Sequence, residues 1–284
     1  MHNPPPGATG AGMKFALAIF LLVAAGAAVF DLATAVFARR YAPEAPSRGL
    51  DTLAWFIREW AASVAVVPWL GLGMLPAGRP KPGRSPAGRV PVLLVHGYDM
   101  NRTTMWPLTW YLRSRGWRWA HAVNHGPWGN PIAGHARHLA DHIAELKRVS
   151  GAPQIDIVAH SMGGLIAGWY IARMNGAGDV RRLVTIGTPW QGTHTAYLGR
   201  KAEARDLEPE SAVIADVAHL PVPVTSIWTP TDQIVVPAAS SAIASAQSVE
   251  LPLAGHLDML VDGRVFAAVR DALSHPDAPS GASA

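Results

Sequence analysis

Cysteine is absent from this 284-residue sequence. A chain without thiols cannot be held together by disulfides, cannot attack a substrate with a thiolate and cannot bind zinc through cysteine. Charged residues are also few, at 15% of the chain, and the formal net charge is +4. The basic residues form no stripe interleaved with aromatic side chains, so we expect no nucleic-acid partner.

Apolar residues make up 49% of the sequence, which is enough to bury a sizeable core. The longest apolar run extends from Phe15 to Ala38, and Asp31 is its one charged residue. A helix of this length can span a bilayer. We therefore expect residues 13–40 to be a membrane anchor, with a cleaved signal peptide or a buried helix as alternatives. An anchor would hold the protein at a bacterial inner membrane, whereas a cleaved signal would make it a secreted protein.

A second apolar stretch, within residues 41–75, runs from Trp60 to Leu75 and contains proline and glycine. It is expected to be half of a membrane hairpin, an interfacial segment, or a helix lying on the rest of the protein, and the sequence leaves these three open. Basic residues flank both stretches, so the side of the membrane on which the remaining chain lies also stays open.

Residues 76–89 are rich in proline and glycine and are predicted to be a stiff linker that few contacts cross. The domain that follows, residues 90–275, should therefore fold without the preceding segments. Residues 1–12 and 276–284 are expected to be disordered.

Within residues 90–275, short apolar strands alternate with helical patterns. The expected strands are 90–95, 119–124, 155–159, 183–186 and 222–228. The expected helices are 104–115, 132–149, 162–174, 237–246 and 265–273. This alternation, with strands that are apolar almost throughout, predicts a mostly parallel sheet covered by helices on both faces.

The most informative segment is I-D-I-V-A-H-S-M-G-G-L-I-A, which spans residues 155–167. In it an apolar strand leads directly into Ser161, and a helical pattern follows at once. A serine on such a turn has a strained backbone, which small residues two positions before and after it permit, here Ala159 and Gly163. We predict that Ser161 is a nucleophile; the alternative is a buried serine that caps the next helix.

A serine nucleophile needs a histidine base, and the base needs an acid that orients it. Asp232, in T-P-T-D-Q-I-V-V-P, and His256, in L-P-L-A-G-H-L-D, each follow an apolar strand. Their order along the chain predicts a triad with Ser161. Asp258 is too close in sequence to His256 to reach the far ring nitrogen, so it is interpreted as a helix-start residue. Weaker candidates for the acid are Asp206, Glu210 and Asp216.

Two backbone N–H groups should stabilise the oxyanion that forms during acyl transfer. Met162, which follows the nucleophile, is predicted to supply one of them. The loop V-L-L-V-H-G-Y-D turns at Gly97, and the amide of Tyr98 is predicted to be the second donor. His96 precedes Ser161, whereas the predicted triad has its histidine after the serine and the aspartate. His96 is therefore expected to be structural.

Together these motifs resemble the small bacterial lipases of the α/β-hydrolase superfamily, particularly the minimal lidless Bacillus type. The matching segments, within residues 90–274, are H-G-Y, A-H-S-M-G, G-T-P-W-Q-G-T, T-D-Q-I-V-V-P and G-H-L. The resemblance implies the α/β-hydrolase fold and esterase or lipase activity with the triad and oxyanion donors named above. The N-terminal apolar region departs from those secreted lipases. Residues 199–220 look longer than the minimal pattern, which leaves a lid there open.

Trp128 and Trp190 each follow a further strand and are candidates for the walls of an acyl pocket, with plain core tryptophans as the alternative. His138 and His142 lie one helical turn apart, but no third ligand has a fitting spacing. We therefore expect a solvated helix face there, no metal and no cofactor.

We expect a serine carboxylic-ester hydrolase that acts on lipid or other acyl esters through an acyl-enzyme intermediate. The alternatives on the same triad are a thioesterase, a phospholipase or an acyltransferase. An alternative from another class is a membrane-tethered binding module without turnover. The sequence leaves the acyl chain length, the head group and the oligomeric state open.

Overall fold

The computed structural model describes residues 8–42, 49–75, 89–243 and 246–275. The predicted tail 276–284 and nearly all of the predicted linker 76–89 lie outside these residues. The first helix begins at Ala8, inside the stretch predicted to be disordered.

In the described part of the chain, six parallel strands form one sheet in the order β2-β1-β3-β4-β5-β6. The strands are β1 (Val92–Val95), β2 (Ala120–Val123), β3 (Ile155–His160), β4 (Val180–Ile186), β5 (Val224–Trp228) and β6 (Gln247–Glu250). Every residue of β1 and β3 is buried, as expected of central strands covered on both faces. The predicted parallel sheet is confirmed.

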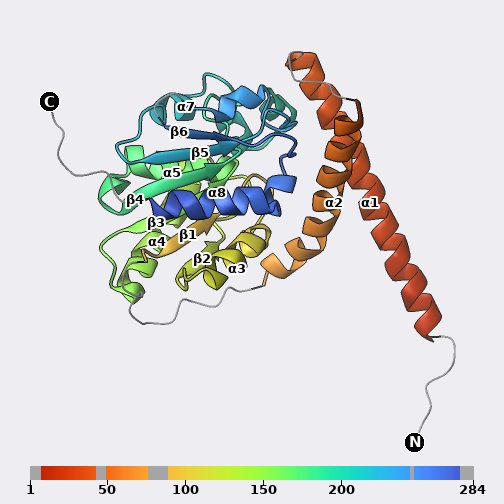
Figure 1. The fold of residues 1–284 in the computed structure, drawn as a ribbon, viewed down its shortest axis with the longest axis horizontal. Helices are drawn as coiled ribbons and strands as arrows, with labels where there is room; N and C mark the ends of the chain where they lie inside the picture. The colour runs from red at the N-terminus through yellow and green to blue at the C-terminus, as the bar shows by residue number, and fades with distance from the viewer. Residues whose placement is uncertain (1–7, 43–48, 76–88, 244–245, 276–284) are drawn as a thin grey trace, which may run out of the picture.

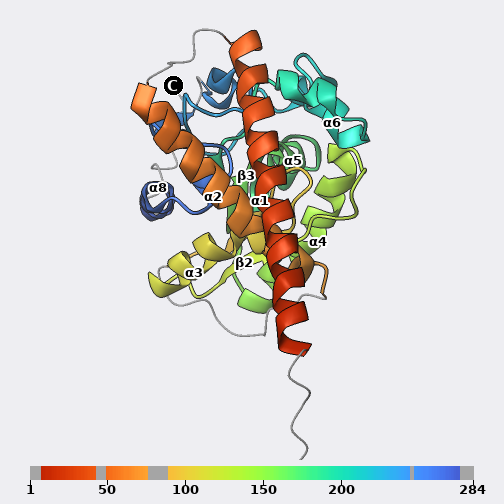
Figure 2. The ribbon, with the colours of Figure 1, turned by 90° about the vertical axis from the view of Figure 1, so that its right-hand side faces the viewer.

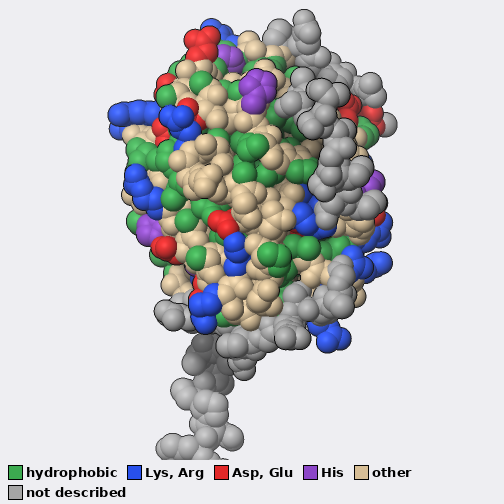
Figure 3. Space-filling view, turned by 90° about the vertical axis from the view of Figure 1, so that its left-hand side faces the viewer, with side chains coloured by type: hydrophobic (Ala, Val, Ile, Leu, Met, Phe, Trp, Pro, Cys, Tyr) green, Lys and Arg blue, Asp and Glu red, His purple; other side chains and the backbone are tan. Residues whose placement is uncertain are grey.

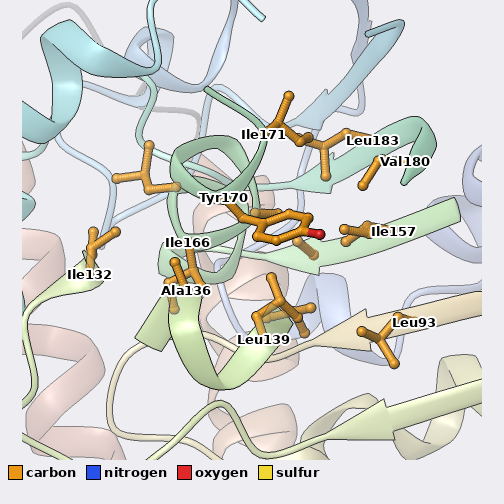
Figure 4. Close-up of a cluster of buried hydrophobic side chains, with 14 of the residues drawn as sticks. Leu93, Ile132, Ala136, Leu139, Ile157, Ile166, Tyr170, Ile171, Val180 and Leu183 are labelled. Carbon is orange, nitrogen blue, oxygen red and sulfur yellow. The ribbon is translucent and has the colours of Figure 1, made fainter. Parts of the chain in front are cut away.

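Helices cover the sheet on both faces (Figure 1). One face carries α4 (Ile132–Ser150) and α5 (Met162–Arg173), and the other carries α3 (Trp106–Ser114) and α8 (Gly263–Ser274). Alternate residues of β1 supply the two cores, because successive side chains of a strand point to opposite faces. Leu93 packs with Leu139 and Tyr170 in one core (Figure 4), whereas Leu94 packs with Leu112 in the other.

Within residues 89–275, the remaining described elements are short and lie in the connections. They are the 3-10 helices η1 (Arg102–Met105), η2 (Gly176–Gly178), η3 (His194–Leu198), η4 (Ala238–Ser241) and η5 (Asp258–Leu260), and the helices α6 (Ala202–Asp206) and α7 (Ala212–Asp216).

The helix predicted for residues 237–246 is wrong, because the described part of that segment contains only the 3-10 helix η4. Ser240 donates its hydroxyl to the Gly192 carbonyl at 2.5 Å and accepts from the Gln191 amide at 3.1 Å. These side-chain bonds to a neighbouring loop hold the segment in a short turn and compete with a regular helix.

The N-terminal region forms a hairpin of two helices, α1 (Ala8–Tyr41) and α2 (Gly49–Gly73) (Figure 2). The Trp60 indole donates to the Ala24 carbonyl at 2.8 Å, and the Ser63 hydroxyl lies 3.3 Å from a carboxylate oxygen of Asp31. The N-terminal half of α1 projects beyond the rest of the molecule (Figure 1). Of the described segments, Leu17–Tyr41 is the one whose length and composition would allow it to cross a membrane.

Helix α2 lies against the part of the chain that follows the predicted linker. The Trp55 indole donates to the Ala254 carbonyl at 3.2 Å, and Arg58 forms ion pairs with Asp258 and Asp262 at 2.8 and 2.7 Å. Of the three alternatives left open for this stretch, these contacts match a helix lying on the rest of the protein. They also contradict the expectation that few contacts cross residues 76–89. A Pro/Gly composition describes the connecting chain and says nothing of the contacts made by the helix before it.

The face away from the hairpin has an ordinary mixed surface. Lys and Arg side chains are scattered over it among acidic, apolar and neutral residues and form no continuous band (Figure 3). The hairpin is therefore the feature that distinguishes one side of this molecule from the other.

A fragment that begins at Arg89 should melt below the full-length protein in the same detergent. It loses the contacts of α2 and exposes the apolar surface beneath that helix. We expect a decrease in Tm of roughly 10 °C or more, since about 1 kcal/mol corresponds to about 2–4 °C at this chain length. A matched fragment that begins at Gly49 keeps α2 and should retain most of the full-length Tm. Equal melting of the Arg89 fragment and the full-length protein would show that α2 contributes no stability.

Candidate active site

Ser161 occupies a strained turn between β3 and α5. Its φ and ψ are 54° and −128°, in a region that side-chain-bearing residues rarely adopt. A Cβ on Gly163 would lie 2.6 Å from the His96 carbonyl oxygen, so a side chain two positions after the serine would collide with backbone. Ser161 precedes the first residue of α5, but its side chain makes no capping hydrogen bond. The hydroxyl is therefore not engaged in the helix cap that was the alternative interpretation.

Asp232 and His256 form a buried pair at the ends of neighbouring strands. His256 Nδ1 lies 2.7 Å from Asp232 Oδ2, and the other oxygen of Asp232 accepts from the amides of Ile234 and Val235, each at 2.8 Å. A neutral imidazole that donates from Nδ1 presents Nε2 as an acceptor. This geometry suits a base whose ring is held in one tautomer.

Two contacts bring this pair to the end of β3. His160, the residue before Ser161, lies with its Nε2 3.2 Å from the His256 carbonyl oxygen, and the two rings are 4.7 Å apart. Gly187 follows β4 with φ 56°, and a Cβ there would lie 3.3 Å from Asp232 Oδ2 and 3.4 Å from His256 Cε1. The structure thus gathers the loops of all three predicted triad residues at the carboxyl edge of the sheet.

The loop after β1 lies directly on the turn at Ser161. A Cβ on Gly97 would approach the Ser161 Cβ to 2.8 Å, so only glycine fits there. The amides of Tyr98, next along that loop, and of Met162, the first residue of α5, are the groups predicted to bind an oxyanion. Their role stays a prediction.

His96 is buried behind this loop rather than open to a substrate. Its Nδ1 donates to the Gly97 carbonyl at 2.9 Å, and its ring stacks on that of His125 at 3.9 Å between centroids. Burial lowers the pKa of His96 to about 4, so the ring is neutral at physiological pH. These contacts fit the structural role expected for it.

The other carboxylates considered for the acid make contacts elsewhere. Asp258 pairs with Arg58 at 2.8 Å, Asp206 accepts from the Ile132 amide at 2.7 Å, and Asp216 pairs with Arg173 at 3.3 Å. Glu210 lies within residues 199–220, like Asp206 and Asp216, and has a φ of 67°.

The two tryptophans proposed as pocket walls lie in different environments. Trp190 is 3% exposed and belongs to the core, where a Cβ on Gly168 of α5 would lie 3.2 Å from its ring. Trp128 is 56% exposed, and Lys201 lies over both its ring and that of Tyr98, at 5.6 and 5.3 Å. Trp128 therefore lies beside the loop after β1, whereas Trp190 packs behind the turn at Ser161. Their contact with an acyl chain stays a prediction.

The two histidines of the α4 face make other contacts: His142 Nε2 donates to the Asn124 carbonyl at 2.9 Å. His138 lies close to Gly126, where a Cβ would be 2.5 Å from its ring. Among residues 8–42, 49–75, 89–243 and 246–275, no three His, Cys, Asp or Glu side chains are arranged to hold a metal ion.

Sequence analysis missed Glu59, a buried carboxylate on α2 that contacts the loop of His256. Its Oε1 accepts from Gln233 Nε2 at 2.6 Å, and its Oε2 accepts from the Asp258 amide at 2.8 Å. Burial raises the pKa of Glu59 to about 7, although the hydrogen bonds and the nearby imidazole oppose that shift. The available signal was a glutamate next to an apolar stretch, because a charge in such a setting needs a specific partner.

No protein-family model matches the sequence. Among solved structures, lipase B of Aspergillus fumigatus superposes with a TM-score of 0.61 at 21% identity, over 74% of this chain and 58% of that chain. The mature form of the Bacillus licheniformis lipase BlEst2 gives 0.59 at 15% identity, over 70% of this chain and 97% of that chain. The naproxen esterase (carboxylesterase NP) of Bacillus subtilis gives 0.50 at 13% identity, over 80% and 99%.

This chain thus spans little more than half of the Aspergillus lipase and nearly the full length of the two Bacillus enzymes. At these identities the similarity concerns the fold. It confirms the fold that the motifs implied: the protein has an α/β-hydrolase fold, and its structural matches include bacterial and fungal lipases and esterases.

Proposed function

We propose that the protein is a serine carboxylic-ester hydrolase that acts on lipid or other acyl esters. The observation that carries this proposal is the strained turn at Ser161, with the buried Asp232–His256 pair in contact with the preceding residue, His160. Lipases and esterases among the structural matches support the same reaction class. Acyl transfer needs a nucleophile, a base and an orienting acid, and these side chains supply the three groups.

In the proposed reaction, His256 Nε2 takes the proton of Ser161 as Oγ attacks the ester carbonyl carbon. The carbonyl oxygen becomes an oxyanion, which the amides of Tyr98 and Met162 stabilise. Collapse of this intermediate breaks the ester bond, and His256 returns its proton to the departing alcohol. Water, deprotonated by His256, then attacks the acyl-enzyme and releases the acid and the free serine.

Electrostatics around His256 favour this proton transfer. Burial alone would lower the pKa of His256, but the Asp232 carboxylate and, more weakly, that of Glu59 outweigh burial and raise it. The imidazolium that forms during attack is thereby stabilised inside the protein.

We propose that α1 is an uncleaved membrane anchor and not a cleaved signal. In a bacterium, such an anchor would hold the enzyme at the inner membrane. Its contacts with α2 through Trp60 and Ser63 would be lost on cleavage. Along its length α1 exposes large apolar side chains. Their contact with water is unfavourable, and burial in a bilayer would remove it. They include Phe15, Leu17, Phe20, Leu22, Val29, Phe30, Leu32 and Val36.

Wild-type protein should react covalently with a fluorophosphonate probe at Ser161, and Ser161→Ala should not. The substitution should lower ester hydrolysis at least about 1000-fold while leaving Tm nearly unchanged, because it removes the nucleophile and little packing. Ser274→Ala, which removes an exposed hydroxyl at the end of α8, is the matched control and should behave as wild type. Activity of Ser161→Ala within tenfold of wild type would place the nucleophile elsewhere.

Asp232→Asn should lower kcat by roughly 10⁴-fold, because an amide no longer favours the working tautomer of His256. Asp258→Asn, which weakens the ion pair with Arg58 on the loop of His256, should stay within about tenfold of wild type. Steady-state rates on a soluble p-nitrophenyl ester would compare them. The reverse pattern would transfer the role of the acid to Asp258.

Full-length protein isolated from membranes should have an intact mass that includes α1. It should stay in the membrane pellet in high salt and be released by detergent, because apolar burial rather than charge holds it. An intact mass lacking residues before Tyr41, or release by salt alone, would contradict the anchor.

A further inference from the structure

Glu59 extends from α2 into the loop that carries His256. The side chain is 0% exposed, and it accepts hydrogen bonds from the amides of Leu257 and Asp258 at 2.9 and 2.8 Å. A Cβ on Gly255 would lie 2.1 Å from Glu59 Oε2, so the loop fits the carboxylate only with glycine at that position. The carboxylate and the loop are therefore matched in shape and in hydrogen bonding.

Gln233 connects Glu59 with both members of the buried pair. It follows Asp232 in sequence, its Nε2 donates to Glu59 Oε1 at 2.6 Å, and its Oε1 accepts from the His256 amide at 3.3 Å. Three successive amides, from His256 to Asp258, are thus held by Gln233 and Glu59. A residue of the N-terminal hairpin, Glu59, therefore fixes the backbone that follows His256, and Gln233 fixes the amide of His256 itself.

We propose that Glu59 is a positioning residue for the hydrolase reaction, which fixes the His256 loop and adds its negative charge to that of Asp232 behind the imidazole. The inference rests on the proposed function, since it assigns Glu59 a role only in a reaction that uses His256 as base. It also makes α2 a part of the active site, supplied from outside the segment that matches the minimal lipases.

The chemistry of the contacts requires a carboxylate. Each oxygen of Glu59 faces an N–H donor, so an amide in either orientation would place an N–H against another N–H. A buried carboxylate is expensive to maintain without such donors, and an apolar side chain there would leave the amides of Leu257 and Asp258 unpaired. Local packing alone therefore does not account for a glutamate at this position.

The charges around His256 determine whether its pKa is raised or lowered. Asp232 and, when ionised above its own pKa of about 7, Glu59 both favour its protonated form. His160 faces it from the end of β3, but burial lowers the pKa of His160 well below its usual value, so that ring stays neutral. Beyond the loop, Arg58 pairs with Asp258 and Asp262, and Arg264 also pairs with Asp262, so two positive charges balance two negative ones on that side.

The C-terminal end of α2 is attached to the loop after β1. Asn101 Nδ2 donates to the Leu70 carbonyl at 2.8 Å, Arg102 Nη1 donates to the Gly73 carbonyl at 2.8 Å, and the Thr103 hydroxyl donates to the Trp69 carbonyl at 3.0 Å. These donors satisfy carbonyls at the C-terminus of the helix. Because α2 is attached near its middle and again at its C-terminus to loops at the carboxyl edge of the sheet, Glu59 is held in one position relative to His256.

The test uses full-length protein in detergent and compares wild type with Glu59→Gln and Glu59→Asp. Glu59→Gln should lower kcat roughly 10- to 100-fold with KM changed by less than about threefold, because the base is misplaced and the substrate contacts are intact. Loss of the negative charge should lower the pKa of His256, so the acid limb of kcat/KM should move to lower pH. Glu59→Asp keeps the negative charge, but its shorter side chain does not reach the amides of the His256 loop. Its kcat should therefore fall, while its acid limb moves less than that of Glu59→Gln.

Ser63→Ala is the matched control, because it lies one turn further along α2 and contacts α1 rather than the His256 loop. Its kcat should stay within about twofold of wild type, and its acid limb should not move. Fluorophosphonate labelling of wild type is measured first, and an unlabelled wild type would defeat the proposed function itself. If wild type is labelled and active, Glu59→Gln with unchanged kcat and an unchanged acid limb overturns the inference. Should Glu59→Gln not fold, a folded Glu59→Asp with wild-type kcat overturns it instead.

Discussion

The backbone conformation of Ser161 is the constraint on which the surrounding structure depends. A residue with φ of 54° between a strand and a helix carries strain of about 1–3 kcal/mol, which the neighbouring structure must offset. The Ser161 amide continues the hydrogen bonding of β3 with β4 by donating to the Ile186 carbonyl at 2.8 Å. Gly97 and Gly163 leave the space that the turn needs. The central place of β3 in the sheet, with both faces buried, holds this turn rigidly.

A second requirement is the stabilisation of ionisable groups in the interior. Asp232, His256 and Glu59 are buried close together, and each is bonded to a backbone amide, an amide side chain or another member of the group. Such a network is stable only when its donors and acceptors are paired. The hairpin takes part in this pairing through Glu59, so it contributes to the candidate site as well as carrying the proposed membrane anchor. This pairing accounts for a glutamate in α2, immediately before its apolar stretch, on the side of the helix that contacts the His256 loop.

The parts of the fold that sequence predicts are those determined locally. Apolar runs such as 155–160 and the helical spacing in 132–150 are visible in any short window, and the sheet and its main helices follow from them. The predicted helix after Pro237 failed because bonds from Ser240 to a distant loop outweighed the local pattern. The order along the chain predicts Asp232 and His256 as a pair, and in the structure the two side chains are in contact. Glu59 could not be found this way, because its partners lie 174 to 199 residues away.

The central claim is that Ser161 becomes acylated during turnover. The most direct measurement is the mass of acid-quenched enzyme, and of its peptides, within the first turnovers of a p-nitrophenyl ester. The account predicts a mass increase equal to one acyl group, located on the peptide that contains Ser161 and lost as the substrate is consumed. An acyl adduct on another residue, or rapid hydrolysis with no adduct on Ser161 at any time, would contradict it.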